Sequence, residues 1–158
     1  MSSSADIGPL LTLLEREESR RDTAALALKQ AQERLAYAQS QLDMLQGYRQ
    51  EYVARWMGEF SRPATPQIMQ SYRDFKGRLE HAVSQQQDSL QQRTSWVERC
   101  REALVEAETR AAAVRKLIER RLAERAREEQ RRERRQEDEF ARQAAWRSSA
   151  LDTLTPID

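Results

Sequence analysis

A run of nine residues, GEFSRPATP at positions 58–66, decides the fold, because it concentrates helix breakers in a chain that otherwise has few. It contains two of the four prolines and one of the four glycines. Proline removes a backbone donor and clashes with the preceding helical turn, so one continuous helix cannot pass through this run. Within it, Thr65-Pro66 is typical of an N-cap followed by proline in the first turn of a new helix. We therefore predict a turn over residues 58–66.

On either side of this turn the sequence has the composition of long helices. Ala, Glu, Lys, Leu and Arg make up about half of the 158 residues, which is typical of a coiled coil. No proline lies between Pro9 and Pro63, or between Pro66 and Pro156. We predict helices over residues 9–57 and 67–147, with a flexible N-terminus over residues 1–8 and a flexible tail over residues 148–158.

Both predicted helices carry a heptad pattern of apolar residues, which indicates a seam for a partner helix. In the first helix Glu17, Arg21 and Arg49 are the exceptions, and in the second the pattern weakens at Gln86 and Arg93. The first seam consists of Leu10, Leu14, Ala24, Leu28, Ala31, Leu35, Ala38, Leu42, Leu45, Tyr52 and Trp56. The second consists of Tyr72, Leu79, Val83, Gln86, Leu90, Arg93, Val97, Cys100, Leu104, Ala107, Ala111, Val114 and Ile118.

Two amphipathic helices joined by a short connection fold back on each other, because each has an apolar stripe to bury. The predicted fold is therefore all-α, a long two-helix antiparallel coiled-coil hairpin. With a turn centred near Arg62, residues whose numbers add to about 124 should face each other, such as Leu28 and Trp96. Residues beyond about 115 have no partner in the first helix, so they should form a C-terminal helical overhang.

The same composition argues against an enzyme, a metal site and a membrane span. With 34% charged residues there is too little apolar material for a deep core with a catalytic cleft. No phosphate-binding loop, nucleophile elbow or metal-ligand motif occurs, and no cofactor is expected. Cys100 is expected to be a small core residue and His81 an ordinary surface residue. No apolar run approaches the length of a membrane span, and no targeting pattern opens the sequence, so we expect a cytosolic protein.

Six of the ten aromatic residues lie close to the predicted turn: Tyr48, Tyr52, Trp56, Phe60, Tyr72 and Phe75. They can form a core at the tip of the hairpin, because large rings cover much area. The alternative is that part of the cluster is exposed as a docking patch. Phe75 is the best candidate for such a patch, because Phe75, Leu79 and Ala82 form a stripe offset from the main seam.

Residues 115–135 hold ten basic residues and five glutamates, followed by the acidic run Glu137-Asp138-Glu139. A solvated helix face is the default interpretation of such a mixed stretch. Binding to an acidic protein surface or an anionic membrane surface stays open as an alternative. Nucleic acid is not expected as a partner, because no aromatic side chain is interleaved to stack on a base.

Three segments resemble the flagellar FliJ family, small coiled-coil components of the bacterial flagellar type III export apparatus. The first is Gln41-Leu42-x-Met44-Leu45-x-x-Tyr48-x-x-Glu51-Tyr52. The second is Tyr72-x-x-Phe75-x-x-x-Leu79-x-x-Ala82, and the third is Asp138-Glu139-Phe140-Ala141-x-x-Ala144-Ala145. The resemblance extends from about Leu10 to Arg147. Because coiled coils share Leu and Ala patterns, the Tyr and Phe residues outside the seam and the acidic tail segment carry most of it.

The resemblance implies a fold similar to the central stalk of rotary ATPases and a role without catalysis. Such a stalk sits in the hexamer of the export ATPase FliI, promotes ring assembly and contacts the export gate protein FlhA. Family members also bind export chaperones and act in the cytoplasm at the inner face of the cell membrane. Carried over by position, the gate-binding residues are Phe75, Leu79 and Ala82, with Gln86 where a family member can have His.

Two other classes of protein fit the same pattern. One is the equivalent stalk of a virulence type III secretion system, which shares the hairpin but serves an injectisome. The other is a generic coiled-coil scaffold, for which the heptads suffice and the stripe of Phe75, Leu79 and Ala82 needs no partner. A stalk should be an elongated monomer, whereas a scaffold should be a dimer or a higher oligomer.

Overall fold

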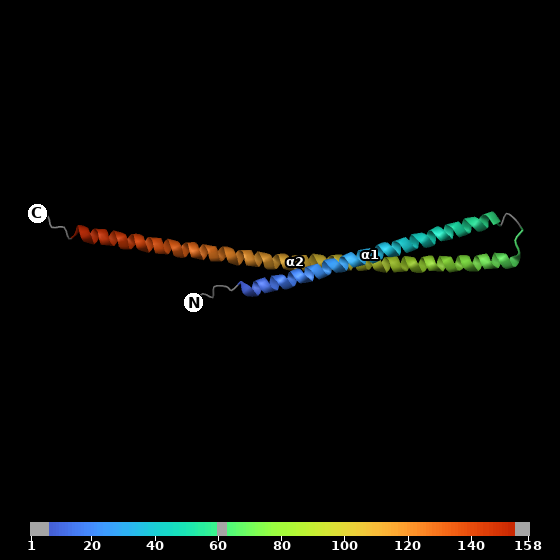
Figure 1. Ribbon diagram of the computed structural model, residues 1–158, viewed down its shortest axis with the longest axis horizontal. Coiled ribbons are helices and arrows are strands. Elements are labelled where there is room, and N and C mark those ends of the chain that lie inside the picture. Colours follow the sequence, from blue (N-terminus) through green and yellow to red (C-terminus); the bar gives the residue numbers. More distant parts are fainter. Residues whose placement is uncertain (1–6, 60–62, 154–158) are drawn as a thin grey trace. The chain divides into compact units, whose positions relative to one another are not determined.

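The computed structural model describes residues 7–59 and 63–153, and they form two long helices packed against each other, as predicted (Figure 1). Helix α1 spans Gly8–Glu59 and helix α2 spans Pro66–Asp152. No strand occurs in these two ranges. The expectations for residues 1–6, for Phe60 and the centre of the turn near Arg62, and for residues 154–158 lie outside the described residues.

The start of α2 confirms the predicted capping. The backbone N–H of Ile68 donates to Thr65 Oγ1 at 3.4 Å, and the N–H of Met69 donates to the Thr65 carbonyl at 3.2 Å. The side chain of Thr65 therefore accepts from one of the N–H groups that have no partner inside the helix. Proline at the first helical position, Pro66, needs no such partner.

The C-terminal end of α2 differs from the prediction, since the helix continues to Asp152 instead of ending at residue 147. Ser148 and Ser149 were expected in a flexible tail, but their hydroxyls donate to the carbonyls of Ala145 and Trp146 at 3.0 and 3.2 Å. Serine can satisfy its hydroxyl on the preceding helical turn in this way, so it need not end a helix.

The chain divides into two parts, of which the larger comprises residues 17–109. In this part α1 and α2 run antiparallel, and Ala31, Val97 and Cys100 form a buried cluster against which Leu28 and Leu35 pack. Every predicted seam position of both helices in this part is buried or half-buried, including the polar exceptions. The heptad pattern therefore predicts the packed face of each helix correctly in this part of the chain.

The predicted register is confirmed by contacts between the helices. Gln86 lies against Ala38, and the rings of Tyr52 and Tyr72 stack at 5.7 Å; both pairs add to 124. Leu28 packs against the Ala31 cluster, whereas Trp96, its expected neighbour, is 49% exposed. Trp96 directly precedes the seam residue Val97, so its ring points out of the seam.

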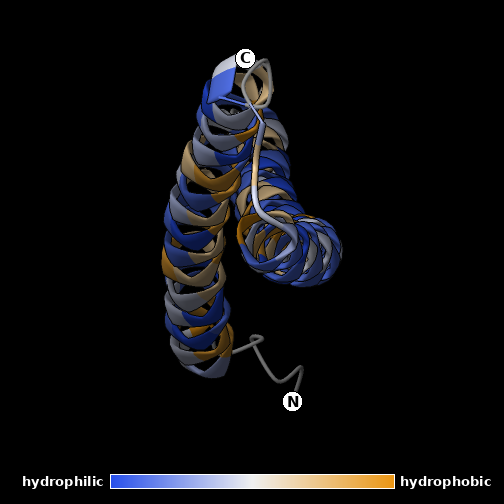
Figure 2. Ribbon diagram, turned by 90° about the vertical axis from the view of Figure 1, so that its right-hand side faces the viewer, coloured by the Kyte–Doolittle hydropathy of each residue, from blue (hydrophilic) through white to orange (hydrophobic). Residues whose placement is uncertain are grey.

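The other part comprises the chain up to Arg16 and the chain from Arg110 onward. Ala111 and Ile118 are buried there, and Leu10, Leu14 and Val114 are half-buried. From residue 122 to residue 149 every side chain of α2 is exposed, as expected for an overhang. Figure 2 shows hydrophobic bands recurring between hydrophilic ones along the helix that leads to the N-terminus.

Candidate docking surface

Five aromatic rings from both helices pack together near the end of the hairpin, with Tyr52 at their centre. The Tyr52 ring lies 4.6 Å from that of Phe75, 5.7 Å from that of Tyr72 and 6.1 Å from that of Trp56, between centroids. Tyr48 meets Phe75 edge-on at 6.3 Å. Such offset and edge-on pairs each add about 0.5–1.5 kcal/mol beyond the area that they bury. The expected tip core is therefore present.

One side of this cluster is open to solvent. An open hollow of about 400 Å³ is lined by Tyr48, Tyr52, Ser71, Asp74, Phe75 and Arg78. Tyr48 is 51% exposed and Phe75 is half-buried, so the edge formed by these two rings is accessible. Asp74 and Arg78 place one charge of each sign at its rim. The cluster thus combines a tip core with an accessible aromatic edge, and docking of a partner at that edge stays a prediction.

The four residues predicted to bind an export gate do not all share one exposed face. Phe75 and Ala82 are half-buried beside the seam, which agrees with an offset stripe. Leu79 is only 7% exposed, so it belongs to the buried seam and not to a free stripe. The burial of Leu79 confirms its place in the predicted seam, seven residues after Tyr72, and is at odds only with its place in the offset stripe. Binding of a gate by these four residues stays a prediction.

Gln86 is tied to the opposite helix. Its Nε2 donates to the backbone carbonyl of Ala38 at 3.0 Å, and its side chain is half-buried. The amide therefore fills the weak point of the seam that the sequence pattern shows at this position. A ligand that needs the Gln86 amide would have to compete with this hydrogen bond.

Sequence reasoning missed Asp74 and Arg78 as neighbours of the Phe75 ring. Arg78 follows Phe75 by three residues, which is the spacing of neighbours on one helix face, so spacing alone could have identified it. Asp74 directly precedes Phe75, and helical spacing gives no signal for it. Asp74 also accepts a hydrogen bond from Gln70 Nε2 at 3.0 Å, which fixes its carboxylate at the rim. The hollow therefore has an aromatic floor and a defined polar edge.

The remaining single residues behave as ordinary structural groups. Cys100 is buried in the Ala31 cluster, as predicted, and His81 is exposed. Within residues 7–59 and 63–153, no three His, Cys, Asp or Glu side chains gather in a way that could hold a metal ion. No helix of this described part is long and apolar enough to cross a membrane.

Glu17 is a buried carboxylate on the seam. Its Oε1 accepts a hydrogen bond from Arg20 Nη1 at 3.2 Å, while its Oε2 is buried without a hydrogen-bond partner among the described residues. The nearby Arg21 donates twice to Asp22, at 3.1 and 2.9 Å, and these hydrogen bonds raise the pKa of Arg21 above its usual value. A buried oxygen without a partner costs stability, so Glu17 is a weak point of the seam.

The basic stretch 115–135 offers a solvated surface. From residue 122 its side chains are all exposed, and glutamates recur between the arginines. Arginine and glutamate three or four residues apart stabilise a helix that has no packing partner. The exposed Phe140, Trp146 and Leu151 follow this stretch, at 77%, 73% and 67% exposure.

Comparisons with known proteins agree with this architecture. The family model described as "Flagellar FliJ protein" matches residues 6–150. The chain is also similar to a protein of Escherichia coli (strain K12) named "Flagellar FliJ protein". The two are 31% identical over 143 residues, which cover 90% of this chain and 97% of that protein. No solved structure gives a significant match.

Proposed function

Because the chain belongs to the flagellar FliJ family, we propose that it is a stalk component, without catalytic activity of its own, of the bacterial flagellar type III export apparatus. In this role it promotes assembly and activity of the export ATPase FliI ring. It also contacts the export gate protein FlhA and export chaperones. The observation that carries the proposal is the family match over residues 6–150, which includes both helices and not one coiled-coil segment alone.

The proposed mechanism depends on asymmetry and stiffness. A two-helix hairpin in the axis of a hexameric ring has no sixfold symmetry, so each ring subunit meets a different surface. Because these contacts differ between subunits, they can favour a different nucleotide state in each subunit of the ring. A stiff helix transmits this difference, whereas a kinked one would not. The uninterrupted backbone of α1 and α2 suits this role.

For the gate we propose the surface around Phe75 as the contact. Phe75, Ala82 and the half-exposed Tyr48 present apolar area to a partner. Leu79, which is buried, acts by holding Phe75 and Ala82 in place, and Gln86 contributes only if its amide leaves Ala38. Partly exposed aromatic rings next to a packed core are typical of residues that dominate an interface energetically.

The place of action follows from these partners. A component that meets both the ATPase ring and the export gate works in the cytoplasm, peripherally associated with the inner face of the cell membrane through the export apparatus. Nothing in the proposal requires the chain itself to enter the bilayer, and nucleic acid has no part in it.

The gate contact is tested by measuring binding of the cytoplasmic part of the export gate to the full chain. Phe75→Ala should weaken binding at least about tenfold if the ring sits in a desolvated pocket of the gate. Phe140→Ala is the matched control, because it also replaces Phe by Ala, but at an exposed position outside the aromatic cluster. Equal binding by wild type and Phe75→Ala would exclude this surface as the gate contact.

The alternative functions are separated by two further measurements. Light scattering after size exclusion should give the mass of a monomer for a stalk, and a dimer or larger species for a generic scaffold. Exchange of the chain into a virulence type III system lacking its own stalk should fail to restore secretion if the role is flagellar. Restored secretion there, without restored swimming in a flagellar deletion strain, would favour the injectisome stalk.

A further inference from the structure

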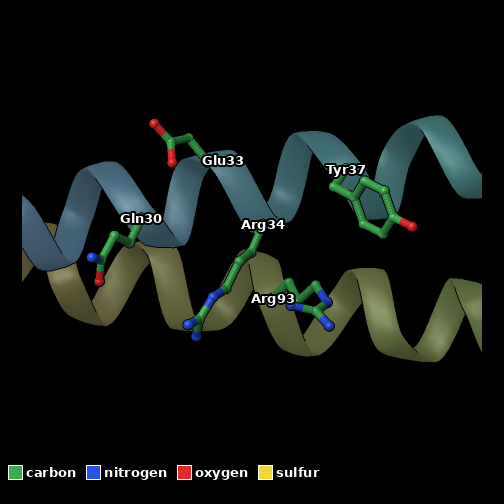
Figure 3. A pocket seen from close by; sticks show the side chains of 5 residues that line it. All are labelled: Gln30, Glu33, Arg34, Tyr37 and Arg93. Carbon is green, nitrogen blue, oxygen red and sulfur yellow. The ribbon is translucent and has the colours of Figure 1, made fainter.

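Two arginines from opposite helices line a shared groove in the middle of the hairpin. A hollow of about 570 Å³ is lined by Gln30, Glu33, Arg34, Tyr37 and Arg93 (Figure 3). A second hollow, of about 300 Å³, is lined by Ala31, Arg34, Ser89, Gln92, Arg93 and Trp96. Because Arg34 and Arg93 line both, the two hollows adjoin, and together they are here called the arginine groove. Figure 3 shows Arg34 reaching from α1 across α2, where Arg93 arises.

Arg93 occupies a seam position that the heptad pattern reserves for an apolar residue. It is half-buried, so its aliphatic stem covers the seam while its guanidinium group reaches the groove. Arg34 is exposed and reaches the same groove from α1. Arginines from opposite helices thus line the same two hollows of the surface.

These two charges are not compensated within the structure. Neither the Arg34 nor the Arg93 side chain forms an ion pair or hydrogen bond with any residue in the part of the chain that the structure describes. The one carboxylate that lines the groove, Glu33, points away from both arginines in Figure 3. On α2, Glu98 does not line the groove and is paired with Arg101 at 2.8 Å. Two arginines against one glutamate leave an excess of positive charge along the lining, so the groove favours an anionic ligand.

Aromatic side chains stand at both ends of the groove. Tyr37 is 66% exposed at one end, and Trp96 is 49% exposed at the other. Arg99 lies over the Trp96 ring at 5.0 Å, which holds that ring in place and adds a third cation nearby. The amides of Gln30 and Gln92 and the hydroxyl of Ser89 supply further hydrogen-bonding groups.

We propose that the arginine groove binds an acidic helical segment of a partner protein. Its carboxylates pair with Arg34 and Arg93, while its apolar side chains lie against Tyr37 and Trp96. Guanidinium groups bind carboxylates with paired hydrogen bonds, which gives orientation as well as affinity. A groove with an aromatic residue at each end suits a long ligand such as a helix better than a single small anion. The charge of the ligand follows from the two uncompensated arginines.

This inference does not depend on the proposed function. The arginine groove and the aromatic surface around Phe75 lie at different places in residues 17–109 and share no lining residue. The groove would therefore bind its ligand whether or not Phe75 contacts an export gate.

The test uses the full chain and a fluorescein-labelled helical peptide with glutamates four residues apart and leucines between them. Fluorescence anisotropy measures its dissociation constant for wild type and for the double variant Arg34→Gln, Arg93→Gln. The double variant should bind at least about tenfold more weakly, because it loses charge-assisted hydrogen bonds from both helices. The control is the double variant Arg49→Gln, Arg55→Gln, which also removes two positive charges, one at a half-buried seam position and one at an exposed position. Its dissociation constant for the peptide should stay within about threefold of the wild-type value.

A second comparison does not depend on how the variants fold. The same peptide with glutamine in place of glutamate should bind wild type at least about tenfold more weakly. Equal losses in both double variants would mean attraction by overall charge, and would overturn the proposal. So would the absence of binding of the acidic peptide to wild type. Displacement of the peptide by inorganic phosphate at equal concentration would assign the groove to a small anion instead, and would also overturn it.

Discussion

The side-chain amide of Gln86 on α2 donates a hydrogen bond of 3.0 Å to the backbone carbonyl of Ala38 on α1. It joins the two helices across a position where the heptad pattern lacks an apolar residue. The Ala38 carbonyl lies within α1, so the amide adds a second donor to an oxygen that the helix already uses. This contact fixes the register of the hairpin at its weakest apolar point.

Removing the Gln86 amide should therefore destabilise the hairpin modestly. We expect Gln86→Ala to lower the free energy of unfolding by about 1 kcal/mol, which is the net value of a typical hydrogen bond. Urea unfolding followed by circular dichroism measures this change. The exposed neighbour Gln85 provides the control, and Gln85→Ala should change stability much less. If the two variants were equally stable, the hydrogen bond would not hold the register.

Leu79 should behave as a core residue. Because it is 7% exposed, Leu79→Ala should lower the free energy of unfolding by about 2–5 kcal/mol through lost burial and the cavity left behind. Leu79→Met keeps the volume and should cost less than about 1.5 kcal/mol. Thermal and urea unfolding check both values. A gate-binding defect of Leu79→Ala alone would thus not identify Leu79 as a contact, and Leu79→Met should retain binding.

At Glu17, in contrast, we expect a substitution to stabilise the fold. Glu17→Leu removes a buried carboxylate oxygen without a partner and leaves only the exposed Arg20 without its ion pair, so it should raise the free energy of unfolding by about 1 kcal/mol or more. Because Glu17 Oε2 has no hydrogen-bond partner among the described residues, its removal leaves no donor unsatisfied. Glu15→Leu, at an exposed position on the same helix, should leave stability nearly unchanged. Destabilisation by Glu17→Leu would show that the carboxylate is better satisfied than its geometry indicates.

A kink in α1 tests whether stimulation of the export ATPase depends on the stiffness of the helix. Leu35→Pro removes a helical hydrogen bond in the middle of α1 and should cost about 3 kcal/mol or more. If the chain stimulates the export ATPase as a stiff stalk, this variant should lose the stimulation. Leu35→Met keeps the packing against the Ala31 cluster and should retain it. Full stimulation by the proline variant, with helicity confirmed on either side of the substitution, would argue against a mechanical role.

The sequence was sufficient for the fold because helix breakers and heptads report backbone geometry directly. Pro63 and Pro66 located the turn, and the seven-residue repeat placed even Glu17 and Arg93 on the packed face. The end of α2 was predicted five residues too early, since Ser148 and Ser149 are favoured both in turns and, through hydroxyl bonds to the preceding turn, in helices.

The candidate surfaces were less predictable for a different reason. The aromatic cluster was expected from its composition, but which ring stays accessible depends on how the rings pack, and Tyr48 proved more exposed than Phe75. The arginine groove was not expected at all. A heptad pattern fixes the direction in which a residue leaves the helix, but not where a long, flexible side chain such as that of Arg34 ends.

The central claim is that this chain acts as the stalk of a flagellar export ATPase, and the most direct test is the ATPase rate of the cognate FliI with and without it. The stalk model predicts that wild type raises the rate and the yield of assembled rings. Phe75→Ala should stimulate as wild type does while losing gate binding, because ring and gate contacts then lie on separate surfaces. An unchanged ATPase rate and an unchanged ring yield across a range of wild-type concentrations would contradict the model.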